Sequence, residues 1–346
     1  MESEPSDAKN ELKALIDNVD EPLKKTFENM HHGYPQETLE RFLKAREGNV
    51  HKTLKMLLDC LTWRVENEID NILAKPIEPI EVYIAVRESQ LIGMTGYSKK
   101  GLPVFALGLG LSTFDKASVD KYVQSHIQIN EYRDCVVLPE ATKKHGSYIG
   151  TCLKVLDMTG LKLSALSRIK ILTTIATIDD LNYPEKTDTY YIVNAPYVFS
   201  ACWKVVKPLL QERTRRKIQV LEGSGREELL KVMDYEALPS FSKCDSSGSS
   251  KYSNGEIIDC FSLRHPFHSE LYNYIKQQAT NRKPTKPIKI GSFHVQVPED
   301  PEGTIIAQTL ESELHKLEGE EKVVNAVHSL KINDGMQSRL ENGDTK

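Results

Sequence analysis

Charged side chains suited to binding anionic groups flank one apolar segment in the middle of the chain. Glu185 precedes this segment, and four cationic residues follow it at Arg213, Arg215, Arg216 and Lys217. Guanidinium and ammonium groups bind phosphate, and a carboxylate accepts hydrogen bonds from hydroxyls. Each basic residue beside an anionic membrane contributes about 1 kcal/mol of attraction. Arg213 and Arg216 could equally serve to stabilise the C-terminus of a helix, and the sequence leaves both interpretations open.

The segment between these charges combines a strand with an unusually apolar helix. Tyr190–Val193 is aromatic and β-branched, which predicts a buried strand. From Tyr197 onwards two adjacent apolar stripes recur at helical spacing: Phe199, Trp203, Val206 and Leu210, and beside them Val198, Cys202, Val205 and Leu209. Pro208 should kink or end this helix. A helix with so narrow a polar side either lies in the core or covers something apolar.

No motif in the sequence indicates a catalytic site. Gly108 and Gly110 follow a predicted strand, but Thr113 stands where a dinucleotide-binding fingerprint has its third glycine. Glu222 stands two residues before Ser224, where a nucleophile elbow requires glycine. Neither the ten histidines nor the six cysteines have metal-ligand spacing. We therefore expect no enzymatic activity, no metal and no cofactor.

The composition is that of a globular protein with a sizeable core. The chain has 346 residues, of which 39% are hydrophobic and 27% charged, and its net charge is −4. This charge gives no basic field for nucleic acid. No uncharged apolar run reaches the ~20 residues of a membrane-spanning helix, and the acidic start does not resemble a signal peptide. With scattered, reduced cysteines, we expect a cytoplasmic monomer that binds no nucleic acid.

Helical and strand patterns divide the chain into successive regions. Helices are predicted over residues 8–20 and 36–47, and Asn49 could cap a third, giving a helical module over residues 1–73. Over residues 74–245 strands alternate with helices, which predicts βαβ units and a largely parallel sheet. The predicted strands are Val104–Leu109, Cys152–Met158, Thr189–Val193 and Lys217–Leu221, and the helices are residues 117–137, 163–181, 197–210 and 226–235.

The remainder of the chain has a different composition. Residues 246–318 are predicted to be a linker and C-terminal extension, beginning with the serine-rich Ser246–Ser250. Residues 271–297 contain five basic and no acidic residues, with one strand expected over 288–297 and a short helix over 304–317. Residues 298–346 contain eleven acidic and five basic residues, a net charge of −6, and 319–346 are expected to be a disordered acidic tail. Phosphorylation of the linker is one regulatory hypothesis.

A set of short motifs gives the chain a family likeness. They are Arg41–Arg46, Val155–Gly160, Tyr183–Glu185, Tyr191–Pro196, Lys207–Leu210 and Lys217–Ile218. In order and spacing they resemble the CRAL-TRIO lipid-binding and lipid-transfer proteins, within them the yeast-type phosphatidylinositol/phosphatidylcholine transfer proteins. The length and tail are most similar to plant members. The resemblance covers about residues 35–245 and says nothing of 251–346.

This resemblance implies an α/β fold in which a helical N-terminal module precedes a sheet that floors a deep lipid pocket. A gate helix, at about residues 197–215, would close the pocket. Exposed acyl chains cost ~0.8 kcal/mol per CH₂ in water, so a carrier must cover them. Phe199, Trp203, Val206 and Leu210 are the pocket and gate residues that the resemblance implies. The alternative is that they are ordinary core.

The family's phosphatidylinositol-headgroup positions correspond to Arg46, Glu185, Thr214 and Lys217. A guanidinium, an ammonium and a hydroxyl can hold a phosphate, and a carboxylate can accept from inositol hydroxyls. For each residue the alternative is a solvated charge or a local ion pair.

One departure from the family concerns the second lipid. Members that also carry phosphatidylcholine have a Ser-x-Thr pair where this chain has Cys152 and Lys154. Both hydroxyls are absent, so the implied choline-lipid contacts are lost. Lys154 either faces solvent or meets an anionic ligand group, and in the second case a different second ligand is expected.

The resemblance thus implies a non-enzymatic carrier. It would bind phosphatidylinositol or a phosphoinositide in an apolar pocket, touch anionic membranes reversibly, and transfer the lipid or present it to phosphoinositide kinases. Three alternatives remain open: a carrier of a neutral ligand such as a sterol, tocopherol or squalene-like compound, a membrane-docking signalling adaptor without transfer, and a lipid esterase of the α/β type.

Overall fold

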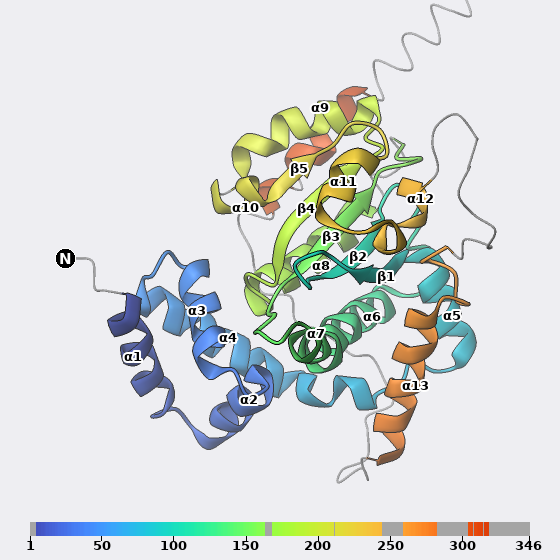
Figure 1. Cartoon of the computed structure of the whole chain (residues 1–346). Coiled ribbons are helices and arrows are strands. Elements are labelled where there is room, and N and C mark those ends of the chain that lie inside the picture. Colours follow the sequence, from blue (N-terminus) through green and yellow to red (C-terminus); the bar gives the residue numbers. More distant parts are fainter. Residues whose placement is uncertain are drawn as a thin grey trace, which may run out of the picture.

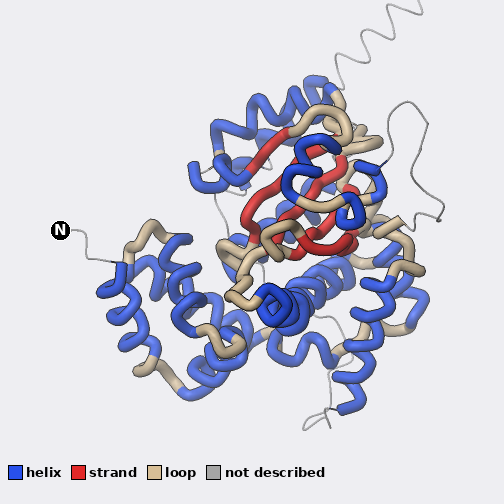
Figure 2. The backbone as a smooth tube through the Cα atoms, viewed as in Figure 1, coloured by secondary structure: helices blue, strands red, loops and turns tan. Residues whose placement is uncertain are grey.

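Helices surround a central sheet on both sides, and a group of N-terminal helices lies to one side of it (Figure 1; Figure 2). This computed structural model describes residues 5–162, 168–210, 212–243 and 259–281, with helical stretches at 304–306, 308–313 and 315–317. The α/β class with a helical N-terminal part and a mostly parallel sheet is confirmed.

Four helices form the N-terminal part. They are α1 (Pro5–Ile16), α2 (Glu21–His31), α3 (Pro35–Ala45) and α4 (Val50–Glu66). Their apolar stripes meet in one cluster, in which Leu12, Leu39, Phe42, Leu57 and Leu61 are fully buried. Asn49 caps α4 as predicted, because its side-chain oxygen accepts from the Lys52 amide at 2.9 Å. The helix α2 was not predicted, so the module contains one helix more than we expected.

The segment between this helical part and the sheet was also not predicted in full. It contains a short 3₁₀ helix, η1 (Ile69–Ala74), then α5 (Ile80–Ser89) and a first strand, β1 (Ile92–Tyr97). β1 pairs antiparallel with β2 (Pro103–Gly108), with a register shift between Met94 and Gly96. The sheet therefore begins with a hairpin before its parallel part.

Three further strands extend the sheet in parallel. β3 (Cys152–Asp157), β4 (Thr187–Val193) and β5 (Ile218–Val220) follow β2, and the strands lie in the order β1-β2-β3-β4-β5. Lys154 on β3 is paired in register with Tyr190 on β4. These strands lie where the alternating pattern predicted them.

The two faces of the sheet pack against different helices. Leu153 and Val155 point to one face, where they join a cluster with Leu229 of α11 (Arg226–Val232), near η5 (Tyr235–Ala237) and α12 (Ser240–Lys243). Cys152 points to the other face, in a cluster that includes Ile127 of α6 (Val119–Tyr132) and Ile178 of α8 (Ile169–Asn182). Because side chains alternate along a strand, Lys154 points to the same side as Cys152.

The helix predicted over residues 117–137 is divided in the structure. α6 ends at Tyr132 and continues as a five-residue π-helical turn, Arg133–Val137, before α7 (Leu138–His145). Such turns are rare and frequent at functional sites. The turn lies on the α6 side of the sheet and carries Arg133 and Asp134, both buried.

The C-terminal half supplies the elements around the predicted gate. α9 (Tyr197–Val206) is followed by a 3₁₀ turn, η4 (Lys207–Leu209), so the helix ends next to Pro208 as predicted, and α10 (Glu212–Lys217) leads into β5. The basic stretch from residue 271 begins inside α13 (Pro266–Asn281), which buries Phe267, Leu271 and Ile275 in the cluster that contains Ile127. The predicted linker at 246–250, the strand at 288–297 and the tail from 319 lie outside the described residues.

Candidate functional site

The loop that enters β4 brings together the two charged ends of the central segment. Glu185 has a left-handed backbone, φ 59°, which is uncommon for a residue other than glycine and persists only where the surroundings enforce it. Its carboxylate accepts from Lys217 Nζ at 2.6 Å and from Arg213 Nη1 at 3.4 Å. Both cations belong to α10, which follows α9 along the chain. The residues on either side of the apolar helix therefore meet at one carboxylate.

A pocket of about 50 Å³ opens beside this ion pair. Glu185, Thr214 and Lys217 line it together with Lys154 and Asp179, among others. Since one water needs ~10–15 Å³ of such volume, the pocket has room for several waters or for a group of about the size of a phosphate. Three of the four predicted headgroup residues thus face one pocket.

Arg46, the fourth, is not among the residues that line this pocket. It caps the C-terminus of α3, and its Nη1 donates to the Ala45 carbonyl at 2.9 Å. The same end of α3 approaches α10, because Arg213 Nη1 donates to the Lys44 carbonyl at 3.4 Å. Arg46 therefore lies on a helix end that touches the pocket region, without facing the pocket itself.

Arg41 is a contact residue that sequence reasoning missed. It is buried on α3, and its Nη1 donates to the carbonyl of Pro184 at 2.9 Å, next to Glu185. This bond ties the N-terminal helices to the loop that carries the pocket carboxylate. The motif Arg41–Arg46 begins and ends with an arginine, so the sequence did mark Arg41. Because both side chains have the same chemistry, only their positions in the fold show that Arg41 contacts the loop before β4.

Lys154 faces the pocket and not the solvent. Its Nζ lies 3.3 Å from Asp179 Oδ2 and 5.6 Å from the centroid of the Tyr190 ring, and its side chain is 13% exposed. Burial disfavours the ammonium, but the Asp179 carboxylate outweighs this and raises the pKa of Lys154 above its usual value. The lysine is therefore charged at neutral pH and directed at the same space as Glu185, Thr214 and Lys217.

Cys152, the other second-ligand position, does not line the pocket. It is fully buried, and its Sγ lies 3.5 Å from the Lys186 carbonyl oxygen, to which it donates. The thiol is thus a buried packing group beside β4. Of Cys152 and Lys154, only Lys154 presents a functional group to the pocket.

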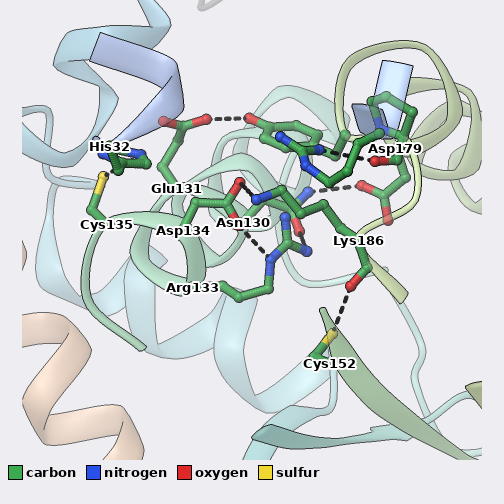
Figure 3. A network of polar contacts seen from close by, with 12 residues as sticks. His32, Asn130, Glu131, Arg133, Asp134, Cys135, Cys152, Asp179 and Lys186 are labelled. Carbon is green, nitrogen blue, oxygen red and sulfur yellow. Dashed lines mark hydrogen bonds and ion pairs between the residues drawn. The ribbon is translucent and has the colours of Figure 1, made fainter. Parts of the chain in front are cut away.

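Arg133 and Lys186, which line the pocket, belong to a buried charge network (Figure 3). Arg133 Nε donates to Asp134 Oδ1 at 2.7 Å, and Lys186 Nζ lies 3.1 Å from Asp134 Oδ2. These groups come from the π-helical turn and the loop before β4. Burial, together with repulsion by Arg41, lowers the pKa of Lys186 to about 7. Asp134 does not prevent this, because its charge is shared with Arg133.

A second part of the network joins α4 to the same loop. Arg64 makes a bidentate contact with Glu131, at 2.8 and 2.9 Å, and Tyr183 donates its hydroxyl to Glu131 at 2.7 Å. Both charged side chains are at most 5% exposed. Sequence reasoning missed this network, because charged residues within a helical pattern are normally assigned to its solvent face.

The predicted gate residues lie along α9 and just after it. Phe199 and Trp203 stack with ring centroids 6.0 Å apart and are half-buried, as is Leu210, whereas Val206 is buried. At the start of the same helix Tyr197 is 76% exposed. In Figure 1, α9 lies at the outer side of the molecule beyond β5.

In the described part of the chain, no three His, Cys, Asp or Glu side chains gather as a metal ion would require. None of the helices described is long and apolar enough to cross a membrane. The five cysteines in described segments are free, among them Cys60, Cys135 and Cys260.

The chain is similar to known proteins over most of the described residues. The model of the CRAL/TRIO domain matches residues 87–242, and that of the CRAL/TRIO N-terminal domain matches residues 8–59. The chain is 29% identical over 210 residues to an Arabidopsis thaliana protein named phosphatidylinositol/phosphatidylcholine transfer protein SFH9, covering 59% of this chain and 36% of that protein. It is 29% identical over 211 residues to the SEC14 cytosolic factor of Eremothecium gossypii, covering 58% of this chain and 67% of the relative.

The fold is also similar to a solved one. The crystal structure of Sfh5 superposes with a TM-score of 0.53 at 20% identity, covering 78% of this chain and 97% of that one. The chain spans between 36% and 55% of the length of three Arabidopsis relatives that it matches. Insect and nematode relatives reach similar identities, 30–32%, so these similarities do not single out plant members.

Proposed function

The chain belongs to the CRAL/TRIO family, and on this premise we propose that it binds phosphatidylinositol or a phosphoinositide and carries it without covalent change. The observation that carries this proposal is that Glu185, Thr214 and Lys217 line one pocket. They lie at opposite ends of a segment of more than thirty residues, and only folding brings them together. These three positions are the ones that the family resemblance associates with an inositol headgroup.

The chemistry of the three residues suits such a headgroup. An ammonium has three donors, and Lys217 uses two of them, on Glu185 at 2.6 Å and on the Thr187 carbonyl at 3.0 Å. The third donor and the Thr214 hydroxyl would hold the phosphate diester. The Glu185 carboxylate would accept from inositol hydroxyls. Arg46 would add a contact only if the headgroup extends towards the end of α3.

We assign the gate role to α9 as part of the same proposal. Its half-buried Phe199 and Trp203 would cover acyl chains, and the exposed Tyr197 would enter the membrane surface when the lipid is exchanged. On α10, Arg215 and Arg216 both contact Glu212. Two cations facing one carboxylate leave a positive charge that an anionic membrane would attract. Such a carrier would be cytoplasmic, would touch membranes reversibly, and would transfer its lipid or present it to a kinase.

Transfer of labelled phosphatidylinositol between two vesicle populations tests this proposal. The full chain should accelerate transfer in proportion to its concentration, and the lipid should be recovered intact. Strong vesicle binding without transfer would favour a docking adaptor. Release of a fatty acid or a headgroup during the assay would instead indicate an esterase.

A further inference from the structure

Three cations line the inner part of the pocket, more deeply buried than the residues matched to the headgroup positions. Side-chain exposure falls from 25% at Lys217 to 13% at Lys154, 9% at Lys186 and 3% at Arg133. We propose that Arg133, Lys154 and Lys186 form an inner anion site that receives a second phosphate group, so that the protein prefers a phosphorylated inositol lipid to phosphatidylinositol. This inference rests on the function proposed above and adds a second site to it.

The first argument is a guanidinium nitrogen of Arg133 that is buried without a partner. Its Nε donates to Asp134 at 2.7 Å and its Nη1 to Asn130 Oδ1 at 2.9 Å, whereas its Nη2 is buried and unpaired. Buried donors are almost always paired, and leaving one unpaired destabilises the folded state. Arg133 also lines the pocket, so a rotation of its guanidinium would bring this buried nitrogen to a phosphate oxygen bound there.

The second argument is that Asp179 does not depend on Lys154 alone. Its contact with Asp179 is 3.3 Å long. Asp179 Oδ1 has two shorter contacts, to His126 Nε2 and to Asn130 Nδ2, both at 2.7 Å. The carboxylate would therefore keep two partners if the ammonium turned towards a ligand, and the ammonium would gain a stronger, doubly charged one.

The third argument is the charge balance of the pocket. Five cationic residues line it against three carboxylates, those of Asp179, Asp180 and Glu185. Two further buried charges lie close by, Asp134 behind the pocket and Arg41 beside it. Because these two charges are opposite, including them leaves an excess of two positive charges. Asp179 and Glu185 already have cationic partners. An anion of two charges would balance the cluster.

The pKa of Lys186 is consistent with this excess. Burial and repulsion by Arg41 lower it to about 7, although Asp134 lies 3.1 Å away. A lysine beside a carboxylate normally keeps its proton firmly. Burial is the largest cause of the low value and repulsion by Arg41 the next, and a bound anion would raise the pKa of Lys186 again.

Vesicles of two compositions test the inner site with the full chain. One set carries phosphatidylinositol in a phosphatidylcholine background, and the other carries an equal amount of mixed phosphatidylinositol monophosphates. We expect the protein to bind the monophosphates at least tenfold more tightly. Equal affinity for both sets would overturn the inner site and leave the proposed function standing. If neither lipid bound, the proposed function and the inner site would fail together.

Two substitutions and a soluble probe identify the site responsible. Lys154→Met keeps the length of the side chain without its charge and should bring the ratio of the two affinities close to one, whereas Lys154→Arg should preserve it. Lys231→Met, on the exposed face of α11, is the matched control and should keep the wild-type ratio. A ratio that Lys154→Met does not change would contradict the assignment. If inorganic phosphate or a free inositol phosphate competed as well as the monophosphate lipid at equal concentration, the site would serve soluble anions, and the lipid preference would be wrong.

Discussion

The Lys217 ammonium lies 2.6 Å from the Glu185 carboxylate. In the sequence, the apolar helix α9 lies between these two residues. Neither side chain is fully buried, since they are 25% and 18% exposed. The pair is thus accessible from the pocket that both residues line. An ion pair that a ligand can reach holds both partners in position before binding, which reduces the ordering cost that the ligand must offset.

The headgroup assignment predicts the effect of a double substitution. Thr214→Asp with Lys217→Ala places a negative charge where the phosphate would lie and removes the ammonium. We expect transfer of labelled phosphatidylinositol to fall at least tenfold, while the circular dichroism spectrum stays that of the wild type. Lys231→Ala on α11 is the control and should transfer normally. Unchanged transfer by the folded double variant would remove the assignment.

The gate assignment predicts a separation of stability from activity. Phe199→Ala and Trp203→Ala affect half-buried side chains, so each should lower the free energy of unfolding by less than the ~3–5 kcal/mol typical of a buried aromatic residue. Lipid transfer should nevertheless fall severalfold. Phe267→Ala, which empties a buried position on α13, is the comparison and should show the full loss of stability in urea.

The α9 variants could instead lose as much stability as Phe267→Ala, with transfer falling only in proportion to the fraction of protein that is folded. That result would mean that Phe199 and Trp203 are ordinary core residues. That result would favour the alternative left open by the sequence. It would leave the proposed headgroup assignment unaffected.

The charge of Lys186 predicts a pH dependence of ligand binding. With a pKa lowered to about 7, the lysine loses its proton as pH rises above 7 in the free protein, and a bound phosphate would hold that proton. Affinity for phosphatidylinositol monophosphates should therefore fall from pH 7 to pH 9, by at most about tenfold per pH unit because one proton is linked. The phosphate itself is already doubly charged in this window, since its second pKa is ~6.

Other groups near Lys186 should not produce this slope. Asp134 stays ionised, because Arg133 and Lys186 hold its pKa well below the usual value despite its burial. Burial lowers the pKa of His32, which is therefore neutral throughout. Lys186→Arg, charged at every pH in this range, should flatten the profile. The same slope in that variant would show that another group is responsible.

The buried pair between α4 and α6 predicts a large stability effect. Glu131→Gln removes the carboxylate that Arg64, 3% exposed, contacts through two nitrogens, and leaves Asp70, at 2.8 Å, as its anionic partner. Removing one partner of a buried pair costs about 3–5 kcal/mol when the other charge is left uncompensated. Because Asp70 remains, we expect a loss near the lower end of this range, which urea denaturation at pH 7 would detect. Asp59→Asn breaks the exposed pair with Lys55 and should cost less than about 1 kcal/mol. Similar losses in both variants would contradict the network's structural role.

The sequence was informative where local rules decide the structure. Helical periodicity located α3, α4 and α11, Asn49 marked the start of α4, and Pro208 marked the end of α9. Apolar runs located the parallel strands β3 and β4, because a strand covered on both faces of a sheet is rich in apolar residues.

The parts that were missed depend on contacts distant in sequence. The segment of β1 contains Gly93 and Gly96, which weaken a strand pattern, and pairing with β2 orders it. Arg133, Asp134 and Lys186 have the composition of a solvent face, and they are buried because the π-helical turn and the loop before β4 meet there. The sequence left open which way Lys154 points. Side chains alternate along β3, so Lys154 lies on the face of the sheet that α6 and α8 cover.

The lipid bound to the purified protein tests the central claim most directly. The full chain would be expressed in a eukaryotic host, its lipids extracted with organic solvent, and the extract weighed by mass spectrometry. We predict an inositol phospholipid near one mole per mole of protein, strongly reduced in the Thr214→Asp, Lys217→Ala variant. A sterol, tocopherol or other neutral isoprenoid in its place, with no inositol lipid, would contradict the account.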